Sequence, residues 1–79
     1  MKFRVWVRNA LRCRTFKYRE NAIAYIYREI REHYKENYDV HPVTIGNTHF
    51  FDVIEYLAPE MIALKRTTFA EYTEYPEKD

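Results

Sequence analysis

The sequence predicts a single small α+β domain, in which an antiparallel sheet is covered by one long helix and one shorter, proline-interrupted helix. Residues 20–38 repeat apolar side chains at steps of three and four, which is typical of one face of an α-helix. Residues 2–8 and 67–75 alternate between apolar and polar side chains instead, as strands with one buried face do. With the segments between them, the expected order is βαββαβ, which is that of ferredoxin-like folds.

The long helix is the segment whose type is clearest. Its buried stripe is expected to consist of Ile23, Ile26, Tyr27, Ile30 and Tyr34. Neither Gly nor Pro interrupts the segment, and we expect the helix to run to about Asn37, because His41-Pro42 cannot continue it. Ile26 and Ile30 should be almost completely buried, since they lie in the middle of the stripe.

The remaining elements follow from turn signals and from the spacing of apolar residues. A short strand or an extended loop is expected at 14–18. A hairpin is expected from Val43–Ile45 and Thr48–Phe51, joined by Gly46-Asn47, a pair that favours positive φ. The hairpin is expected to lead directly into the shorter helix.

The shorter helix is predicted because apolar residues between positions 50 and 64 also fall on one helical stripe. These residues are Phe50, Val53, Ile54, Leu57, Met61 and Leu64. A proline inside a helix costs about 3 kcal/mol but little in the first turn, so one helix should end near Ala58 and another turn begin at Pro59. The strand at 67–75 then completes the sheet, and residues 76–79 form a frayed acidic tail.

Composition limits the class of protein. The chain has 79 residues, of which 47% are hydrophobic, so one domain with a buried core is expected. The single cysteine, Cys13, cannot form an internal disulfide, which fits a reducing compartment. Neither a signal peptide nor a membrane span is evident, so we expect a cytoplasmic protein without a membrane partner. With Gly46 as the only glycine, a phosphate-cradling loop is nearly excluded.

Charge is distributed unevenly along the chain. Residues 1–19 carry seven basic side chains and no acid, whereas residues 36–79 carry nine acids and three bases. Such asymmetry favours nucleic acid or a charged protein as a partner. It would also allow two copies to pair antiparallel as a homodimer.

The basic and aromatic side chains of the first strand are the strongest binding candidates. Together with nearby residues they give the candidate set Lys2, Arg4, Trp6, Arg8, Arg12, Arg14, Lys17, Tyr25, Tyr72 and Tyr75. Arginines and an aromatic ring on one open face could hold phosphates and stack a base. The alternative is that the last strand lies beside the first, where Glu71 or Glu74 would neutralise the arginines.

Tyrosines are abundant, and several are expected outside the core. Tyr25 lies almost opposite the buried stripe of the long helix, and with Trp6, Tyr72 and Tyr75 it could form one or two recognition patches. Aromatic residues and arginine dominate binding hot spots. The alternative is that these aromatic side chains are scattered singly over the surface.

Catalytic and metal motifs are weak. His33, His41 and His49 are spaced eight apart, which matches no metal-ligand spacing, so neither a metal nor another cofactor is expected. His49 could act as a general acid or base, but no second partner stands at an informative spacing.

The sequence therefore predicts a non-enzymatic protein that recognises a partner protein, as an adaptor or as an inhibitor of a larger complex. Small phage and mobile-element proteins are often of this kind. A nucleic-acid-binding module that uses the first strand is the alternative hypothesis. A small histidine-dependent nuclease is the third.

Overall fold

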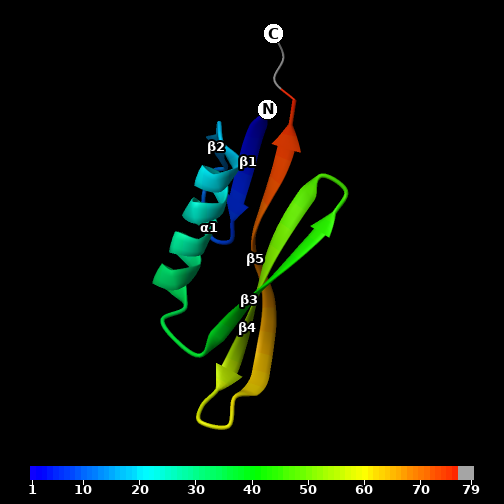
Figure 1. Ribbon diagram of the computed structural model, residues 1–79. Coiled ribbons are helices and arrows are strands. Elements are labelled where there is room, and N and C mark those ends of the chain that lie inside the picture. Colours follow the sequence, from blue (N-terminus) through cyan, green and yellow to red (C-terminus); the bar gives the residue numbers. More distant parts are fainter. Residues whose placement is uncertain (77–79) are drawn as a thin grey trace.

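The alternating segment at the start of the chain forms a strand, and four further strands join it in one antiparallel sheet. The computed structural model describes residues 1–76. Its elements are β1 (Lys2–Val7), β2 (Arg14–Phe16), α1 (Arg19–His33), β3 (Tyr38–Ile45), β4 (Thr48–Leu57) and β5 (Ile62–Tyr75). The strand order is β2-β1-β5-β4-β3, and α1 lies along one face of the sheet (Figure 1).

The α+β class is thus confirmed, whereas the ferredoxin-like order and the second helix are wrong. The described residues contain one helix, not two. The first and last strands do lie side by side and antiparallel, as expected. The short strand expected near residue 14 is β2, and the expected acidic tail lies, from residue 77 onward, outside the described residues.

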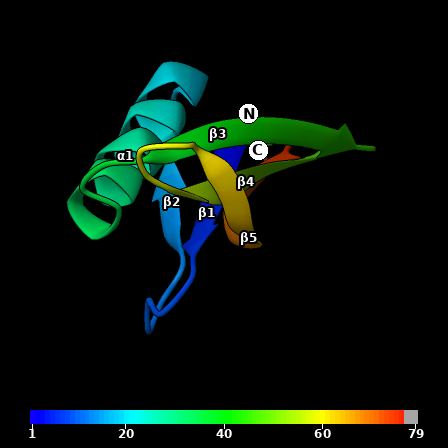
Figure 2. The same ribbon diagram turned by 90° about the horizontal axis from the view of Figure 1, so that it is seen from below.

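The core lies between α1 and the sheet face that α1 covers, here called the covered face. From α1, the fully buried side chains are Ala22, Ile26 and Ile30, which confirms the prediction for the two isoleucines. The buried side chains of the sheet are Phe3, Val5, Val7, Phe51, Val53, Phe69, Ala70 and Tyr72. Figure 2 views the molecule along its long axis, with α1 on one side of the twisted sheet. We call the other side the open face.

The helix ends four residues earlier than expected. Tyr34 leaves the helical conformation, although its backbone N–H still donates to the Ile30 carbonyl at 2.8 Å. The Tyr34 ring packs 5.4 Å from the ring of Phe69, centroid to centroid. Asn37 then adopts a positive φ of 57°, a conformation that Asn tolerates, and β3 begins at the next residue.

Residues 50–64 form two strands and a turn instead of the predicted helix. β4 is flanked by β3 and β5, so backbone groups on both of its edges are paired. Phe51 and Val53 point to the covered face, while Phe50 and Ile54 point to the open face. Because apolar residues lie on both faces of β4, their positions also match one stripe of a helix. The pairing of β4 with its two neighbours determines that the segment is a strand and not a helix.

The predicted turn at Gly46-Asn47 is confirmed. Gly46 has a φ of 62°, and β3 and β4 pair from Ile45 and Thr48 outward. Both strands are longer than expected. Pro42 lies within β3 at the edge of the sheet, where a residue without an N–H removes no hydrogen bond between strands.

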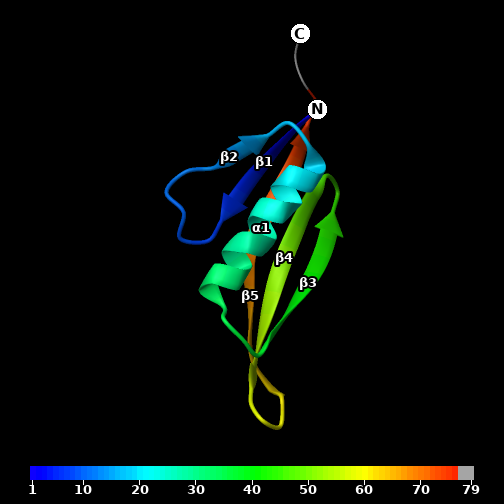
Figure 3. The ribbon, with the colours of Figure 1, turned by 60° about the vertical axis from the view of Figure 1, so that its left-hand side comes forward.

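The far end of the β4–β5 hairpin extends well past α1 (Figures 1 and 3). The molecule is therefore elongated, with principal extents of 53 × 23 × 21 Å.

Candidate binding surfaces

The hairpin tip, residues 57–64, exposes a group of large apolar side chains. Leu57, Met61, Ile62 and Leu64 are each between 49% and 62% exposed. Glu60 is the one charged residue in this segment. Leu57 and Ile62 are cross-strand partners, and large apolar side chains exposed together in a segment that projects from the body of a protein are typical of an interaction site.

Met61 occupies a backbone conformation that L-residues avoid. Its φ is 57°, which places it in the left-handed region, where a residue with a Cβ costs about 1–2 kcal/mol relative to glycine. The side chain is half exposed and does not belong to the core. The core therefore does not explain a methionine at this position.

Sequence reasoning missed the hairpin tip because it assigned Leu57, Met61 and Leu64 to a buried helical stripe. The turn signal that could have located the tip was Pro59, which was interpreted as a helix start. The bond between Ala58 and Pro59 is cis, and the strands β4 and β5 pair on either side of the turn up to Leu57 and Ile62.

A second candidate surface is the basic hollow between β2 and α1, a depression of about 370 Å³. Its lining residues are Arg14, Phe16, Asn21, Ala24, Tyr25, Arg28 and Arg31. The guanidinium carbons of Arg14 and Arg28 lie 4.6 Å and 5.4 Å from the centroid of the Tyr25 ring. No acidic residue of the described chain lines this hollow.

The register of β2 explains why Arg14 lies here. Its Cα is paired with Val5, a core residue, so Arg14 projects to the covered face at the edge of the sheet. Phe16, two residues on, shares that face, and its ring lies 5.4 Å from Tyr25. Tyr25 is therefore half-buried and in contact with two arginines, and does not stand alone on the surface.

Three of the candidate residues remain together on the open face of β1. These are Lys2, Arg4 and Trp6, and Tyr75 joins them from β5 with its ring 4.8 Å from the guanidinium carbon of Arg4. Trp6 is the cross-strand partner of Glu71. Within residues 1–76, no ion pair joins Arg4 to either acid named in the neutralisation hypothesis, because Glu74 contacts Arg19 and His49.

The other candidate residues are dispersed. Arg8 follows the end of β1 and lines a different depression with Glu29, Glu32 and His33 of α1. Arg12 is exposed in the loop between β1 and β2, and the Lys17 ammonium lies 5.8 Å from the ring centroid of Tyr18. The expected single footprint is thus divided between the open face, the basic hollow and the loop.

Tyr72 belongs to the core, in contrast to the exposed recognition patch expected from the sequence. It is 3% exposed on the covered face and stacks on the His49 ring, with 4.4 Å between centroids. Burial raises the pKa of its hydroxyl, which the nearby Arg19 partly opposes. Because β5 is the middle strand and α1 covers this face, Tyr72 cannot contact a partner while the helix and sheet stay packed.

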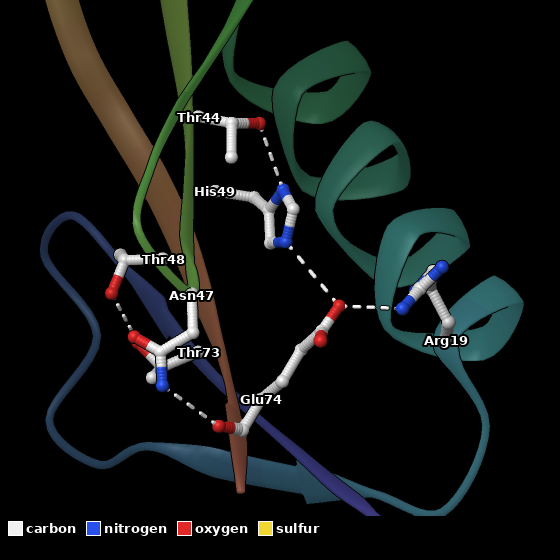
Figure 4. A network of polar contacts seen from close by, with 7 residues as sticks. All are labelled: Arg19, Thr44, Asn47, Thr48, His49, Thr73 and Glu74. Carbon is white, nitrogen blue, oxygen red and sulfur yellow. Dashed lines mark hydrogen bonds and ion pairs between the residues drawn. The ribbon is translucent and has the colours of Figure 1, made fainter.

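His49 has the partners that sequence spacing did not indicate (Figure 4). Its Nδ1 lies 2.9 Å from Thr44 Oγ1, and its Nε2 lies 3.3 Å from Glu74 Oε1. Arg19 Nη2 donates to the same Glu74 oxygen at 2.6 Å. The Thr44 hydroxyl, the His49 imidazole and the Glu74 carboxylate form a row of groups that can relay a proton. However, His49 lines neither the basic hollow nor the depression beside Arg8. The network joins the β3–β4 hairpin to β5 and to the start of α1.

The open face also carries a partly buried carboxylate beside an apolar depression. Asp52 accepts hydrogen bonds from Thr68 Oγ1 at 2.7 Å and from Arg66 Nε at 2.8 Å. Burial raises the pKa of this carboxyl, but the two hydrogen bonds and the positive charge of Arg66 outweigh burial and lower it below its usual 3.8. Val43, Ile45 and Phe50 line the depression beside this pair.

Within residues 1–76, no three His, Cys, Asp or Glu side chains are placed to hold a metal ion together. The helix α1 is neither long enough nor apolar enough to span a membrane, and it is the one helix of the described chain.

Comparisons with protein-family models, with curated proteins and with solved structures found no match. The class of protein is therefore assigned from its structure alone. It is a small α+β protein in which one helix covers one face of a five-stranded antiparallel sheet, with a projecting apolar hairpin tip and a basic hollow.

Proposed function

We propose that this protein recognises a partner protein by inserting its hairpin tip into an apolar pocket on that partner. The observation that carries this proposal is the exposure of four large apolar side chains at the end of a hairpin that extends beyond the helix. Such a role requires no catalytic residue and is compatible with an adaptor or with an inhibitor.

Burial of the tip can supply part of the free energy of specific binding, and contacts around the tip must supply the rest. Full burial of a side chain such as Leu, Ile or Met contributes about 1.5–3 kcal/mol, and about half of each surface is still exposed here. The four side chains can therefore contribute about 3–6 kcal/mol before the costs of association.

The conformation of Met61 supports a role for its side chain in binding. A glycine would satisfy the left-handed backbone at lower cost, so local stability does not favour methionine. Methionine is enriched in protein interfaces, where its flexible thioether adapts to an irregular pocket.

A protein pocket suits the hairpin tip better than a lipid surface does. Glu60 lies in the middle of the tip, and insertion would carry its carboxylate into the hydrocarbon region, which is costly. Anionic lipid headgroups would also repel the Glu60 carboxylate. A protein pocket can supply a donor to this carboxylate at its rim.

The experiment compares capture of partners from host extract by the wild-type protein, by a Met61→Gly/Ile62→Ser variant and by an Ile45→Ser control. Ile45 is as exposed as the tip residues but lies next to the opposite turn. We expect at least one protein to be captured by the wild type and the control, and about tenfold less by the tip variant, with similar melting temperatures.

Two further measurements test whether the hairpin tip binds a second copy of the chain or a membrane instead of a partner protein. Light scattering that shows a wild-type dimer and a monomeric tip variant would assign the tip to a second copy of the chain. Tip-dependent binding to anionic vesicles would assign it to a membrane. Either result, or capture that is unchanged in the tip variant, would overturn the proposal.

A further inference from the structure

We propose that the basic hollow is a binding site for the phosphates of single-stranded nucleic acid. This site is separate from the hairpin tip and does not depend on the function proposed for it. It is formed by β2 and α1, whereas the tip lies at the far end of the β4–β5 hairpin (Figures 1 and 3).

Two arginines of the hollow share one aromatic ring. The guanidiniums of Arg14 and Arg28 lie over the Tyr25 ring at 4.6 Å and 5.4 Å from its centroid. Stacking on a ring uses the face of a guanidinium and leaves its in-plane N–H groups available. The Tyr25 ring thus restricts the motion of two guanidiniums before a ligand arrives, which lowers the entropy cost of binding.

The hollow is positively charged, which favours an anion as its ligand. Arg14, Arg28 and Arg31 all line it, and none of its lining residues in the described chain is acidic. The arginine ion pairs of residues 1–76 involve Arg19 and Arg66 instead. Three cations in one depression repel each other, and an anion with several acceptor oxygens would relieve that repulsion. Arginine binds phosphate with paired N–H donors, so phosphate is the anion of best geometric fit.

A second cationic depression lies on the other side of β2. Phe16 lines both the basic hollow and a neighbouring depression of about 370 Å³. Lys2, Thr15 and Lys17 complete the lining of that second depression, which also contains no acid among the described residues. Thr15 and Lys2 lie on the open face and Arg14 lies on the covered face, so the two depressions flank the edge strand β2. A chain of phosphates that passes around this edge could reach both depressions, which one isolated phosphate group could not.

An exposed tyrosine that follows β2 favours a single strand over a duplex. Tyr18, next to Lys17 in the chain, is 52% exposed and can stack on an unpaired base. In a duplex the faces of the bases are covered by their neighbours, and a ring outside the helix gains nothing from stacking. A flexible single strand can place phosphates in both depressions and a base on Tyr18.

The test is fluorescence anisotropy with a labelled oligothymidylate of about 15 nucleotides, measured at several salt concentrations between about 50 and 200 mM. The main variant is Arg28→Gln/Arg31→Gln. Its matched control is Lys35→Gln/Lys65→Gln, which removes the same charge from exposed positions outside the hollow. The oligonucleotide should bind the wild type and the control within about twofold of each other, and the main variant about tenfold more weakly.

The dependence on salt supplies a second readout. Each lost phosphate contact to a single strand should reduce the slope of log K against log salt by about 0.7, so the double variant should lose about 1.4. Tyr18→Ser should weaken binding without changing that slope, because stacking releases no counterions. The Met61→Gly/Ile62→Ser variant should bind as the wild type does, which separates this site from the hairpin tip.

A variant that does not remove charge guards against a folding defect. Arg14→Lys retains the positive charge but loses the planar pair of donors, and it should weaken binding several-fold with an unchanged melting temperature. Equal losses in the main variant and its control would overturn the proposal, because net charge alone would then explain binding. Tighter binding of a duplex of equal length, or of inorganic polyphosphate, would also overturn it, as would the absence of binding at the lowest salt.

Discussion

Truncation of Ile30 is the most direct test of how the helix stabilises this fold. Ile30 is fully buried in the middle of the core, between α1 and the covered face. Ile30→Ala removes three carbon atoms, which at about 0.8 kcal/mol each amounts to about 2.4 kcal/mol of lost burial. The cavity that remains adds to this, so the expected loss is about 2–5 kcal/mol.

That loss is a large part of the total stability. At about 0.05–0.15 kcal/mol per residue, a chain of 79 residues has an unfolding free energy of about 4–12 kcal/mol. In a domain of this size, 1 kcal/mol shifts the melting temperature by about 4–8 °C, so we expect a decrease of at least about 10 °C. Thermal unfolding followed by circular dichroism measures the shift.

The matched control is Ile45→Ala, the same truncation at a side chain that is 67% exposed in the edge strand β3. It should cost less than about 1 kcal/mol, because the removed atoms are already in water. If Ile30→Ala melted within about 3 °C of the wild type while the control behaved as expected, the packing of α1 on the sheet would be refuted.

Two further predictions concern a carboxylate and a turn. Asp52 has a lowered pKa in the folded protein, so its stabilising contribution is complete above its unfolded value near 3.8 and is lost as pH falls through the folded value. Asp52→Asn should therefore lower the free energy of unfolding near neutral pH. Urea titrations should show that the difference in this free energy between the variant and the wild type becomes smaller in acid. A difference that became larger in acid would contradict the lowered pKa of Asp52. Gly46→Ala should cost about 1 kcal/mol in urea unfolding, because φ is 62° although the space around the position is open, and Gly46→Asn should cost less; equal costs would show that the left-handed conformation is not the cause.

Local patterns predicted the elements that depend on local chemistry. The helix at Ile26 and Ile30, the first strand and the turn at Gly46-Asn47 were all predicted, because side-chain period and positive φ determine each of them. The end of the helix was not predicted, because it depends on Tyr34 packing against Phe69, a residue 35 positions away in the chain.

The segment from Phe50 to Leu64 shows where pattern reasoning fails. Apolar residues on both faces of a strand can be assigned to a helical stripe, and the sequence does not reveal that β4 has a neighbour on each edge. Two such neighbours satisfy its backbone groups, which removes the advantage of a helix. The error also concealed the hairpin tip, because a helix would have buried Leu57 and Met61.

The sequence offered two residues of the basic hollow as binding candidates but did not place them together. The importance of Arg14 and Tyr25 was inferred, and the structure brings them together at 4.6 Å. The sequence analysis grouped Tyr25 with Trp6, Tyr72 and Tyr75 and did not predict its contact with Arg14, because the register that pairs Arg14 with Val5 is set by the sheet. Arg28 and Arg31 were not among the candidates from the sequence, and only their position beside β2 gives them a candidate role.

The two proposed surfaces have a geometric consequence for the choice between adaptor and inhibitor. The hairpin tip and β2 lie toward opposite ends of a molecule whose longest extent is 53 Å (Figure 1). A partner pocket that encloses the tip would leave the basic hollow accessible, since α1 and β2 lie along the body of the sheet. An inhibitor needs one surface that occupies a site, whereas a protein with two separate surfaces can hold two partners at once. If both proposals hold, the arrangement therefore favours an adaptor that joins a protein to a strand of nucleic acid.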